Sequence, residues 1–137
     1  ITQGPGIVAI RYEMIHETRL IPLDDSPRSG LPSHMGEARG RWDGNTLVVE
    51  TMNFDPRTIY RNASPSLKLT ERFTPTAPGI IEWSMTVDDP DTWTRPWTFA
   101  MRLTSDPEQQ YFEYACHEGN YAMRNILSAA RAAEAGK

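Results

Sequence analysis

The sequence predicts an all-β fold, namely a strongly curved antiparallel sheet or a small lipocalin-like barrel, followed by one C-terminal α-helix. Three observations support this prediction. First, 11 prolines and 9 glycines interrupt the 137 residues throughout, which favours many short strands. Second, the segments between them alternate apolar and polar residues, as half-buried strands do. Third, only the last segment repeats its apolar residues at helical spacing. We therefore expect a single domain over residues 1–137.

Eight segments are expected to form strands, because each is rich in β-branched or aromatic residues between turn signals. They are Ile7–Ile15, Thr18–Leu23, Gly36–Trp42, Thr46–Phe54, Ser66–Thr74, Ile80–Val87, Trp97–Thr104 and Gln110–Cys116. The clearest connection is Asp43-Gly44-Asn45, because glycine accepts the positive φ that a tight hairpin turn requires. Closing a barrel would require the first and last of these strands to pair.

The C-terminal helix is expected over about residues 120–134. In an Ala-rich segment without proline, four apolar residues follow the i, i+3, i+4, i+7 spacing: Met123, Ile126, Leu127 and Ala130. Asn120 is a suitable N-cap. We expect this apolar stripe to pack on the sheet as a lid.

The strands are expected to have one apolar face and one charged face. The apolar faces gather Leu67, Leu69, Phe73, Ile81, Trp83, Met85, Val87, Trp97, Phe99, Met101 and Leu103. On the opposite faces the charges alternate in sign along the series Glu50, Arg72, Glu82, Arg102 and Glu113. Cross-strand neighbours of opposite charge contribute about 0.2–1 kcal/mol a pair. We interpret the charged face as the solvated exterior and the Trp- and Met-rich face as the interior.

Composition and charge exclude several classes of protein. Hydrophobic residues make up 39% and charged residues 23% of the chain, which is typical of a globular domain. A net charge of -4 without a basic cluster argues against nucleic-acid binding. No apolar run approaches the roughly 20 residues that cross a bilayer. The single cysteine, Cys116, excludes an internal disulfide and is expected to be buried. Phosphate-loop, dinucleotide, zinc-protease and serine-hydrolase motifs are absent.

Two of the three histidines are candidates for chemistry. His16 lies at a bend close to Glu13 and Arg19, which indicates either a hydrogen-bonded corner or an acid/base site with an anion clamp. His117 lies just before the helix, whose N-terminus favours a neutral imidazole that can act as a base or a metal ligand. His34 lies in a Pro- and Ser-rich loop and is expected to be solvated.

Pairing of the first and last strands would bring His16 and His117 to one region. With Glu13 or Glu113 they would form an acid/base set or a two-histidine, one-carboxylate metal site. Asp89 is a further carboxylate that could orient an imidazole. We expect no metal or other cofactor.

The segment Asp88–Trp97 is the most unusual in composition. It begins with three acids in four residues, but it lacks the ligand spacing and terminal glutamate of a known calcium loop. An Asx-type turn is therefore expected. Trp97 continues an apolar face and is assigned to the core, whereas Trp93 is the expected ligand contact.

A pair of arginines, Arg39 and Arg41, lies on one side of the strand that precedes the tight turn, beside Trp42. The pair would either hold an anionic group or, in the case of Arg41, pair with a carboxylate of the neighbouring strand.

Several stretches form long and specific motifs: Gly40–Thr51, Val87–Trp97, Tyr114–Tyr121 and Ile21–Leu23, with the single positions Glu13, His16 and Arg19. In these stretches the chain resembles a family of uncharacterised, secreted bacterial proteins. The resemblance implies an extracellular or periplasmic location, and it implies that the chain is the C-terminal part of a longer protein. It implies no particular activity.

These observations lead to three hypotheses of function. The leading one is a secreted domain that binds a small apolar or aromatic molecule, or a sugar, in its interior. Its expected ligand-binding residues are Arg19, Arg41, Trp42, Trp93, Tyr114 and Tyr121. The second is an acid/base lyase, isomerase or hydrolase that uses His16 and His117, with Glu13 or Asp89. The third is an assembly module that binds a second copy or an upstream domain through the helix or through the Trp-containing segment Asp88–Trp97.

Overall fold

The computed structural model describes residues 1–57, 63–110, 114 and 119–136. Within these ranges, short strands are followed by one helix: β1 (Thr2–Gly4), β2 (Ile7–Arg11), the 3₁₀ turn η1 (Met14–His16), β3 (Thr18–Pro22), β4 (Glu37–Asp43), β5 (Thr46–Met52), β6 (Lys68–Ala77), β7 (Ile80–Asp88), β8 (Trp97–Thr104) and α1 (Ala122–Ala135). The mostly-β class and the C-terminal helix are confirmed.

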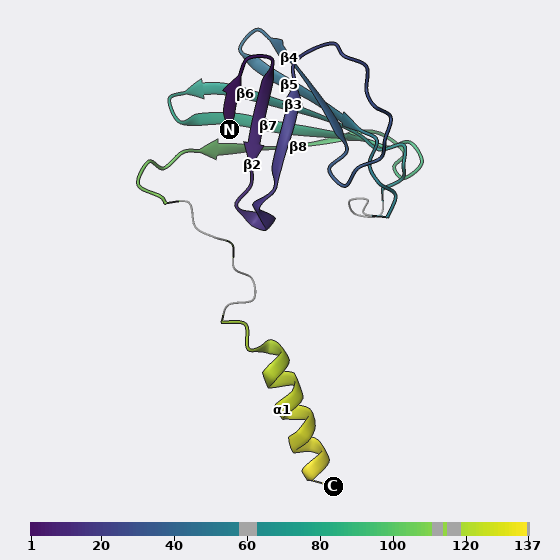
Figure 1. Cartoon of the computed structure of the whole chain (residues 1–137), viewed down its shortest axis with the longest axis vertical. Helices are drawn as coiled ribbons and strands as arrows, with labels where there is room; N and C mark the ends of the chain where they lie inside the picture. Colours follow the sequence, from purple (N-terminus) through teal and green to yellow (C-terminus); the bar gives the residue numbers. More distant parts are fainter. Residues whose placement is uncertain (58–62, 111–113, 115–118, 137) are drawn as a thin grey trace.

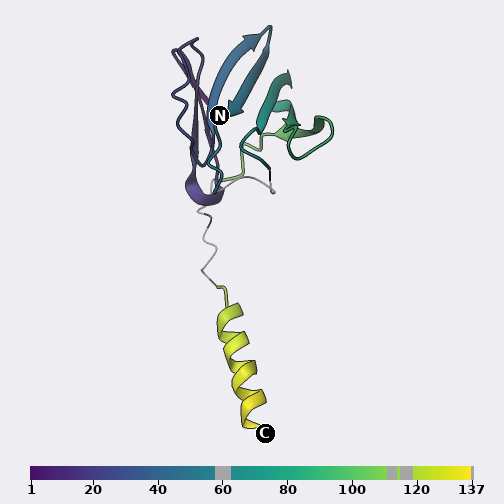
Figure 2. The same cartoon turned by 90° about the vertical axis from the view of Figure 1, so that its right-hand side faces the viewer.

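The strands form two antiparallel sheets that pack against each other. One has the order β1-β2-β3, and the other has the order β4-β5-β6-β7-β8. Figure 1 shows the strands of the smaller sheet running across those of the larger one, and Figure 2 shows the two sheets as separate layers. The core between them joins apolar residues of both sheets: Val8, Ile10, Ile21, Ala38, Leu47, Val49 and Phe73.

A closed barrel is not formed by the described residues. The larger sheet ends at β4 on one side and β8 on the other, and the smaller sheet remains a separate hydrogen-bonded unit. The predicted last strand lies outside the described residues except for Gln110 and Tyr114, neither of which is in a strand. Pairing between the first and last strands therefore remains a prediction, and the fold established here is a two-layer sheet packing.

The first predicted strand is interrupted, which corrects the expected range Ile7–Ile15. Strand β2 ends at Arg11, and Ile15 and His16 adopt positive φ values of 63° and 57°. Such values are incompatible with extended backbone and are costly for a β-branched residue. The turn is closed by the Tyr12 amide, which donates to the Glu17 carbonyl at 2.8 Å.

The tight hairpin is confirmed between β4 and β5. Asp43 pairs with Thr46, and Gly44 has a φ of 60°, so the glycine supplies the left-handed conformation that the turn needs. The two strands stay in register as far as the pair Glu37 and Met52. This hairpin fixes one edge of the larger sheet.

The predicted charged exterior is confirmed in part. Glu82 and Arg102 face each other across β7 and β8, with a 2.8 Å contact between Oε1 and Nε. Arg72, however, lies opposite Ser84 and contacts Asp43 at 2.9 Å. Glu113 lies outside the described residues. These are exposed pairs, and their contribution to stability is small.

The helix does not cover the sheet, so the expected lid is wrong for the described structure. No residue of α1 is buried, and Met123, Ile126 and Leu127 are 68%, 64% and 47% exposed. In both views α1 lies apart from the two sheets (Figures 1 and 2). The N-cap is Tyr121 and not the expected Asn120, although Asn120 Oδ1 accepts the Ala122 amide at 3.0 Å.

Candidate functional site

The candidate site begins with a carboxylate on the inner face of the larger sheet. In β6, strand alternation places Glu71 on the same face as Leu69 and Phe73. Its strand neighbours in the ladder are Val49 and Met85, and only 3% of the residue is exposed. A buried carboxylate among apolar neighbours is unfavourable unless other groups compensate it.

Arg19 of β3 provides this compensation from the opposite layer. Its Nη2 forms an ion pair and hydrogen bond with Glu71 Oε2, and it also donates to Thr51 Oγ1 at 3.4 Å. Its Nη1 donates to the Tyr12 hydroxyl at 3.3 Å. Burial lowers the pKa of Arg19, but Glu71 and Tyr12 raise it by more, so the guanidinium stays charged.

The second oxygen of the carboxylate is bound by Trp83. The Trp83 indole Nε1 donates to Glu71 Oε1 at 3.3 Å. The Trp83 ring stacks with Phe73 at a centroid distance of 6.2 Å and meets Phe99 edge to face at 5.3 Å. Contacts of this type hold the ring in one orientation. The inner face therefore presents a fixed aromatic wall beside a neutralised ion pair.

Next to this network lies a cavity of about 340 Å³. It is lined by Arg19, His34, Met35, Thr51, Phe54, Leu69, Trp83, Met85 and Phe99. Six of these residues are apolar, and Arg19, Thr51 and His34 supply the polar groups. An apolar hollow with a few convergent polar groups is the usual form of a small-molecule site.

The turn that carries His34 and Met35 is held in place by backbone contacts. Ser33 forms a β-bridge with Phe54, and the Asp55 amide donates to the Ser33 carbonyl at 2.8 Å. Gly36 has a φ of 68°, and a Cβ there would lie 2.8 Å from the Met52 carbonyl oxygen. Only glycine fits this close approach. These contacts hold the turn that carries His34 and Met35 against the end of β5.

The same loop is tied to the larger sheet by Glu37. Its carboxylate accepts the Ser29 amide at 2.6 Å and the Asn53 side chain at 2.9 Å. These hydrogen bonds, with that of Ser29 first, lower the pKa of Glu37. Arg39 completes the attachment, because it donates to the Pro27 carbonyl at 3.2 Å. Arg39 therefore has a structural role in the described chain.

Of the expected ligand-binding residues, Arg19 alone lines this cavity. Arg41 lines a polar surface hollow of about 200 Å³ and contacts Glu50 at 3.4 Å, as the alternative interpretation expects. Trp42 is 47% exposed and lines a different hollow of about 270 Å³. Tyr114 and Tyr121 are 44% and 62% exposed and line none of these hollows.

Trp93 lies in a second apolar cluster. It meets Trp97 edge to face at 5.8 Å and packs with Leu67 and Val87. The core assignment of Trp97 is thereby supported. The expected ligand contact of Trp93 remains a prediction: Trp93 does not line the cavity beside Arg19, although its cluster shares Phe54, Leu69 and Met85 with the cavity lining.

The expected acid/base set is not assembled by the described residues. Glu13 and His16 are exposed at the turn η1, and His117 lies outside the described residues. His34, expected to be solvated, is exposed but also lines the cavity beside Arg19. Within the described ranges, no group of three His, Cys, Asp or Glu residues is arranged to hold a metal ion.

Asp89 anchors a loop. It is 1% exposed and accepts hydrogen bonds from the Ser64 amide and hydroxyl, both at 2.6 Å, and from the Asp91 amide at 3.3 Å. The last of these is the expected Asx-type contact. Burial raises the pKa of Asp89, but the hydrogen bonds lower it by more, so its carboxylate stays ionised.

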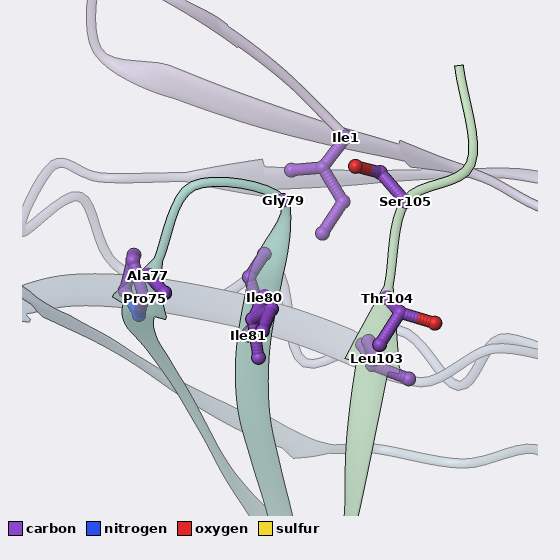
Figure 3. A pocket seen from close by; sticks show the side chains of 9 residues that line it. All are labelled: Ile1, Pro75, Ala77, Gly79, Ile80, Ile81, Leu103, Thr104 and Ser105. Atoms are coloured by element: carbon purple, nitrogen blue, oxygen red, sulfur yellow. The ribbon is translucent and has the colours of Figure 1, made fainter.

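A larger hollow of about 520 Å³ lies between the start of β7 and the end of β8. Figure 3 shows the Ile1 side chain reaching between Ile80 and Ser105 in this hollow. The described residues that line it include no acidic, basic or histidine side chain. The cavity beside Arg19 is the better candidate site, since it combines apolar walls with polar groups.

Comparison with known proteins does not assign this chain to a family. No family model matches the sequence. No curated protein and no solved structure matches it either. Among the described residues, no helix is long and apolar enough to cross a membrane. The site must therefore be interpreted from its own geometry.

Sequence reasoning missed four residues of the hydrogen-bonding network at this site, namely Tyr12, Thr51, Glu71 and Trp83. It also missed the lining residues Met35 and Phe54. One signal for Glu71 was present in the sequence. The alternation that places Leu69 and Phe73 inside also places Glu71 inside, and a charge at such a position indicates a buried partner.

Proposed function

We propose that this chain is a small-ligand-binding domain and that its ligand occupies the cavity beside Arg19. The observation that carries the proposal is the 340 Å³ hollow, whose apolar walls meet a fixed polar network on one side. An extracellular or periplasmic location, and membership of the secreted bacterial family that the motifs resemble, belong to the same proposal. So does a lipocalin-like layout, in which antiparallel strands enclose an interior site.

Aromatic ligands fit this cavity better than sugars. Trp83 and Phe99 offer ring surfaces, and Met35 and Met85 offer polarisable thioethers that pack well against aromatic rings. A sugar needs many hydrogen-bonding partners, and the described part of the lining supplies polar side chains from Arg19, Thr51 and His34 only. The ligand class proposed is therefore a small aromatic molecule.

A fluorescent probe tests this proposal. N-phenyl-1-naphthylamine is aromatic and uncharged, and its emission rises in apolar surroundings. We expect saturable binding of one probe per chain. Met35→Trp enlarges a side chain that lines the cavity and should weaken binding at least about tenfold by steric exclusion. Met123→Trp places the same substitution on exposed α1 and should leave binding unchanged. Equal binding by both variants and the native chain would contradict the proposed site.

A second candidate function is self-association through α1. The observation that favours it is the apolar stripe Met123, Ile126 and Leu127, which no part of the described chain covers. The proposed occupant is the same stripe of a second copy. The acid/base alternative with His16, His117, Glu13 and Asp89 remains a prediction that no described contact favours.

A further inference from the structure

The charges at the cavity wall are balanced. Among the residues that the structure describes, Arg19 is the one arginine or lysine that lines the cavity, and its guanidinium is paired with Glu71. The two side chains are 10% and 4% exposed, so water screens this pair little. At the edge of the cavity, Asp55 follows the lining residue Phe54 and is paired with Arg57 at 2.6 Å. The wall therefore offers an incoming ligand no uncompensated positive charge from these groups.

Hydrogen-bonding capacity nevertheless remains at this wall. The Nε–H of Arg19 is buried and has no partner among the described residues. Thr51 accepts a hydrogen bond from Arg19, so its own hydroxyl hydrogen is available to another acceptor. The Arg19 Nε–H has almost no accessible surface, so the Thr51 hydroxyl, on a residue that lines the cavity, is the donor proposed to meet a ligand acceptor. The wall therefore offers a hydrogen-bond donor, the Thr51 hydroxyl, but no unpaired positive charge from Arg19.

We propose that the cavity selects uncharged aromatic ligands that carry a hydrogen-bond acceptor, such as a carbonyl, ether or phenol oxygen, and that Glu71 is the residue that excludes organic anions. This inference rests on the proposed function. An anion in the cavity would lose its hydration and would lie near the Glu71 carboxylate, which already occupies the guanidinium. Glu71 therefore acts through Arg19, as a specificity-determining residue.

Two probes with a common ring skeleton test the proposal. N-phenyl-1-naphthylamine is uncharged, and 8-anilino-1-naphthalenesulfonate adds one sulfonate to the same rings. The native chain should bind the uncharged probe about tenfold or more tightly than the sulfonate. Because the sulfonate is also the more soluble probe, the decisive quantity is how each affinity changes when the charge balance is altered.

Glu71→Gln is the decisive variant, because it keeps the shape and removes the charge that neutralises Arg19. The ratio of the affinity for the sulfonate to the affinity for the uncharged probe should rise about tenfold. Glu82→Gln is the matched control: it makes the same change of charge on the exposed outer face, next to Arg102, and should alter neither affinity.

A second variant covers the case in which Glu71→Gln does not fold. Met35 lies in a turn outside the sheets and lines the cavity, so Met35→Lys adds a positive charge there without disturbing the ion pair. The sulfonate should again gain affinity relative to the uncharged probe. Folding of each variant is checked by cooperative unfolding in urea.

The outcomes distinguish a failure of the proposed binding site from a failure of the proposed selection by charge. If neither probe binds the native chain, or if Met35→Trp binds both as well as the native chain does, the proposed function fails. If the uncharged probe binds in the cavity but a folded Glu71→Gln variant leaves the ratio of the two affinities unchanged, the selection by charge is wrong while the binding site stands. If Glu71→Gln is unfolded, an unchanged sulfonate affinity in Met35→Lys overturns it in the same way.

Discussion

Arg19 and Glu71 join the two sheets of this protein through a buried ion pair, although 52 positions separate them in the chain. Arg19 comes from the three-stranded sheet and Glu71 from the centre of the five-stranded sheet. Burying either charge alone costs several kcal/mol, so neither is tolerable without the other. The pair therefore fixes how the two layers face each other, and it also forms the polar wall of the cavity.

The first prediction concerns the stability that depends on this pair. Arg19→Met leaves Glu71 buried without its cation and should lower the free energy of unfolding by about 3 kcal/mol. Adding Glu71→Leu to Arg19→Met removes the stranded charge and should restore most of the loss. Urea unfolding of the single and double variants measures both values.

The matched control for this prediction is the exposed pair Glu82 and Arg102, whose side chains are 44% and 63% exposed. Arg102→Met should change the free energy of unfolding by less than about 1 kcal/mol. An Arg19→Met variant as stable as Arg102→Met would show that Glu71 is not a buried charge in solution.

A second prediction concerns the close approach of the two sheets at Gly40. A Cβ at this position would lie 2.8 Å from Ile21 Cγ2 and 2.8 Å from Leu23 Cδ2. Since Ile21 is fully buried in β3, it cannot move aside without disturbing the core. Gly40→Ala should therefore destabilise the fold by about 1–3 kcal/mol in urea unfolding.

Gly4→Ala is the control for crowding at Gly40. A Cβ on Gly4 would meet Ile7 Cγ2 at 3.4 Å, which is an ordinary contact. The Gly4→Ala variant should be at least as stable as the native chain, because alanine restricts the unfolded chain more than glycine does. Equal stabilities of the two alanine variants would contradict the tight inter-sheet contact.

Local features of the fold were predictable from the sequence. The hairpin at Gly44 depends on one residue's conformational freedom, and alternation alone indicates the inner faces of β6 to β8. Met101 is the exception, because it was assigned to the interior and is 49% exposed. The division into two layers was not predictable in this way. It depends on the connection between Pro22 and Glu37, which leads from β3 in the smaller sheet to β4 in the larger one and contains no named strand. No local residue pattern in this connection indicates that β4 joins a new sheet.

Only part of the candidate site was predictable from the sequence. Arg19 was singled out because arginine, histidine and carboxylate crowd one short segment, and it does line the cavity. Its partner Glu71 belongs to another sheet, and sequence spacing carries no information on which strands pack face to face. The same limit explains why Arg41 and Trp42 were grouped with Arg19, although they line other hollows.

A third prediction concerns Asp89. The Ser64 amide donates a hydrogen bond to Asp89 Oδ2 at 2.6 Å, a distance that indicates a charge-assisted hydrogen bond. Asp89→Asn removes the charge and should weaken this hydrogen bond. At fixed pH, exchange of the Ser64 amide hydrogen should accelerate about tenfold or more. Asp88→Asn, at the neighbouring half-buried position, is the control and should leave this exchange rate unchanged.

The pKa of Asp89 gives the pH dependence of the same contacts. Its folded-state pKa is lowered from 3.8, so the stabilisation is present above about pH 3.8 and is lost as the pH falls through the folded-state pKa. An NMR titration of the Asp89 carboxyl carbon should give a midpoint below 3.8. A midpoint at or above that value would mean that the hydrogen bonds from Ser64 do not persist in solution.

The last prediction separates a lid from an association surface on α1. Changing Ile126 and Leu127 together to glutamine should alter the free energy of unfolding by less than about 0.5 kcal/mol, because both side chains are exposed. If the stripe binds a second copy, light scattering should show a dimer for the native chain at high concentration and a monomer for this variant. Changing Arg124 and Arg131 to glutamine, at positions outside the stripe, is the control and should leave the mass unchanged. A large loss of stability in the Ile126 and Leu127 variant would instead show that the helix packs on the sheets in solution, as the original lid hypothesis expects.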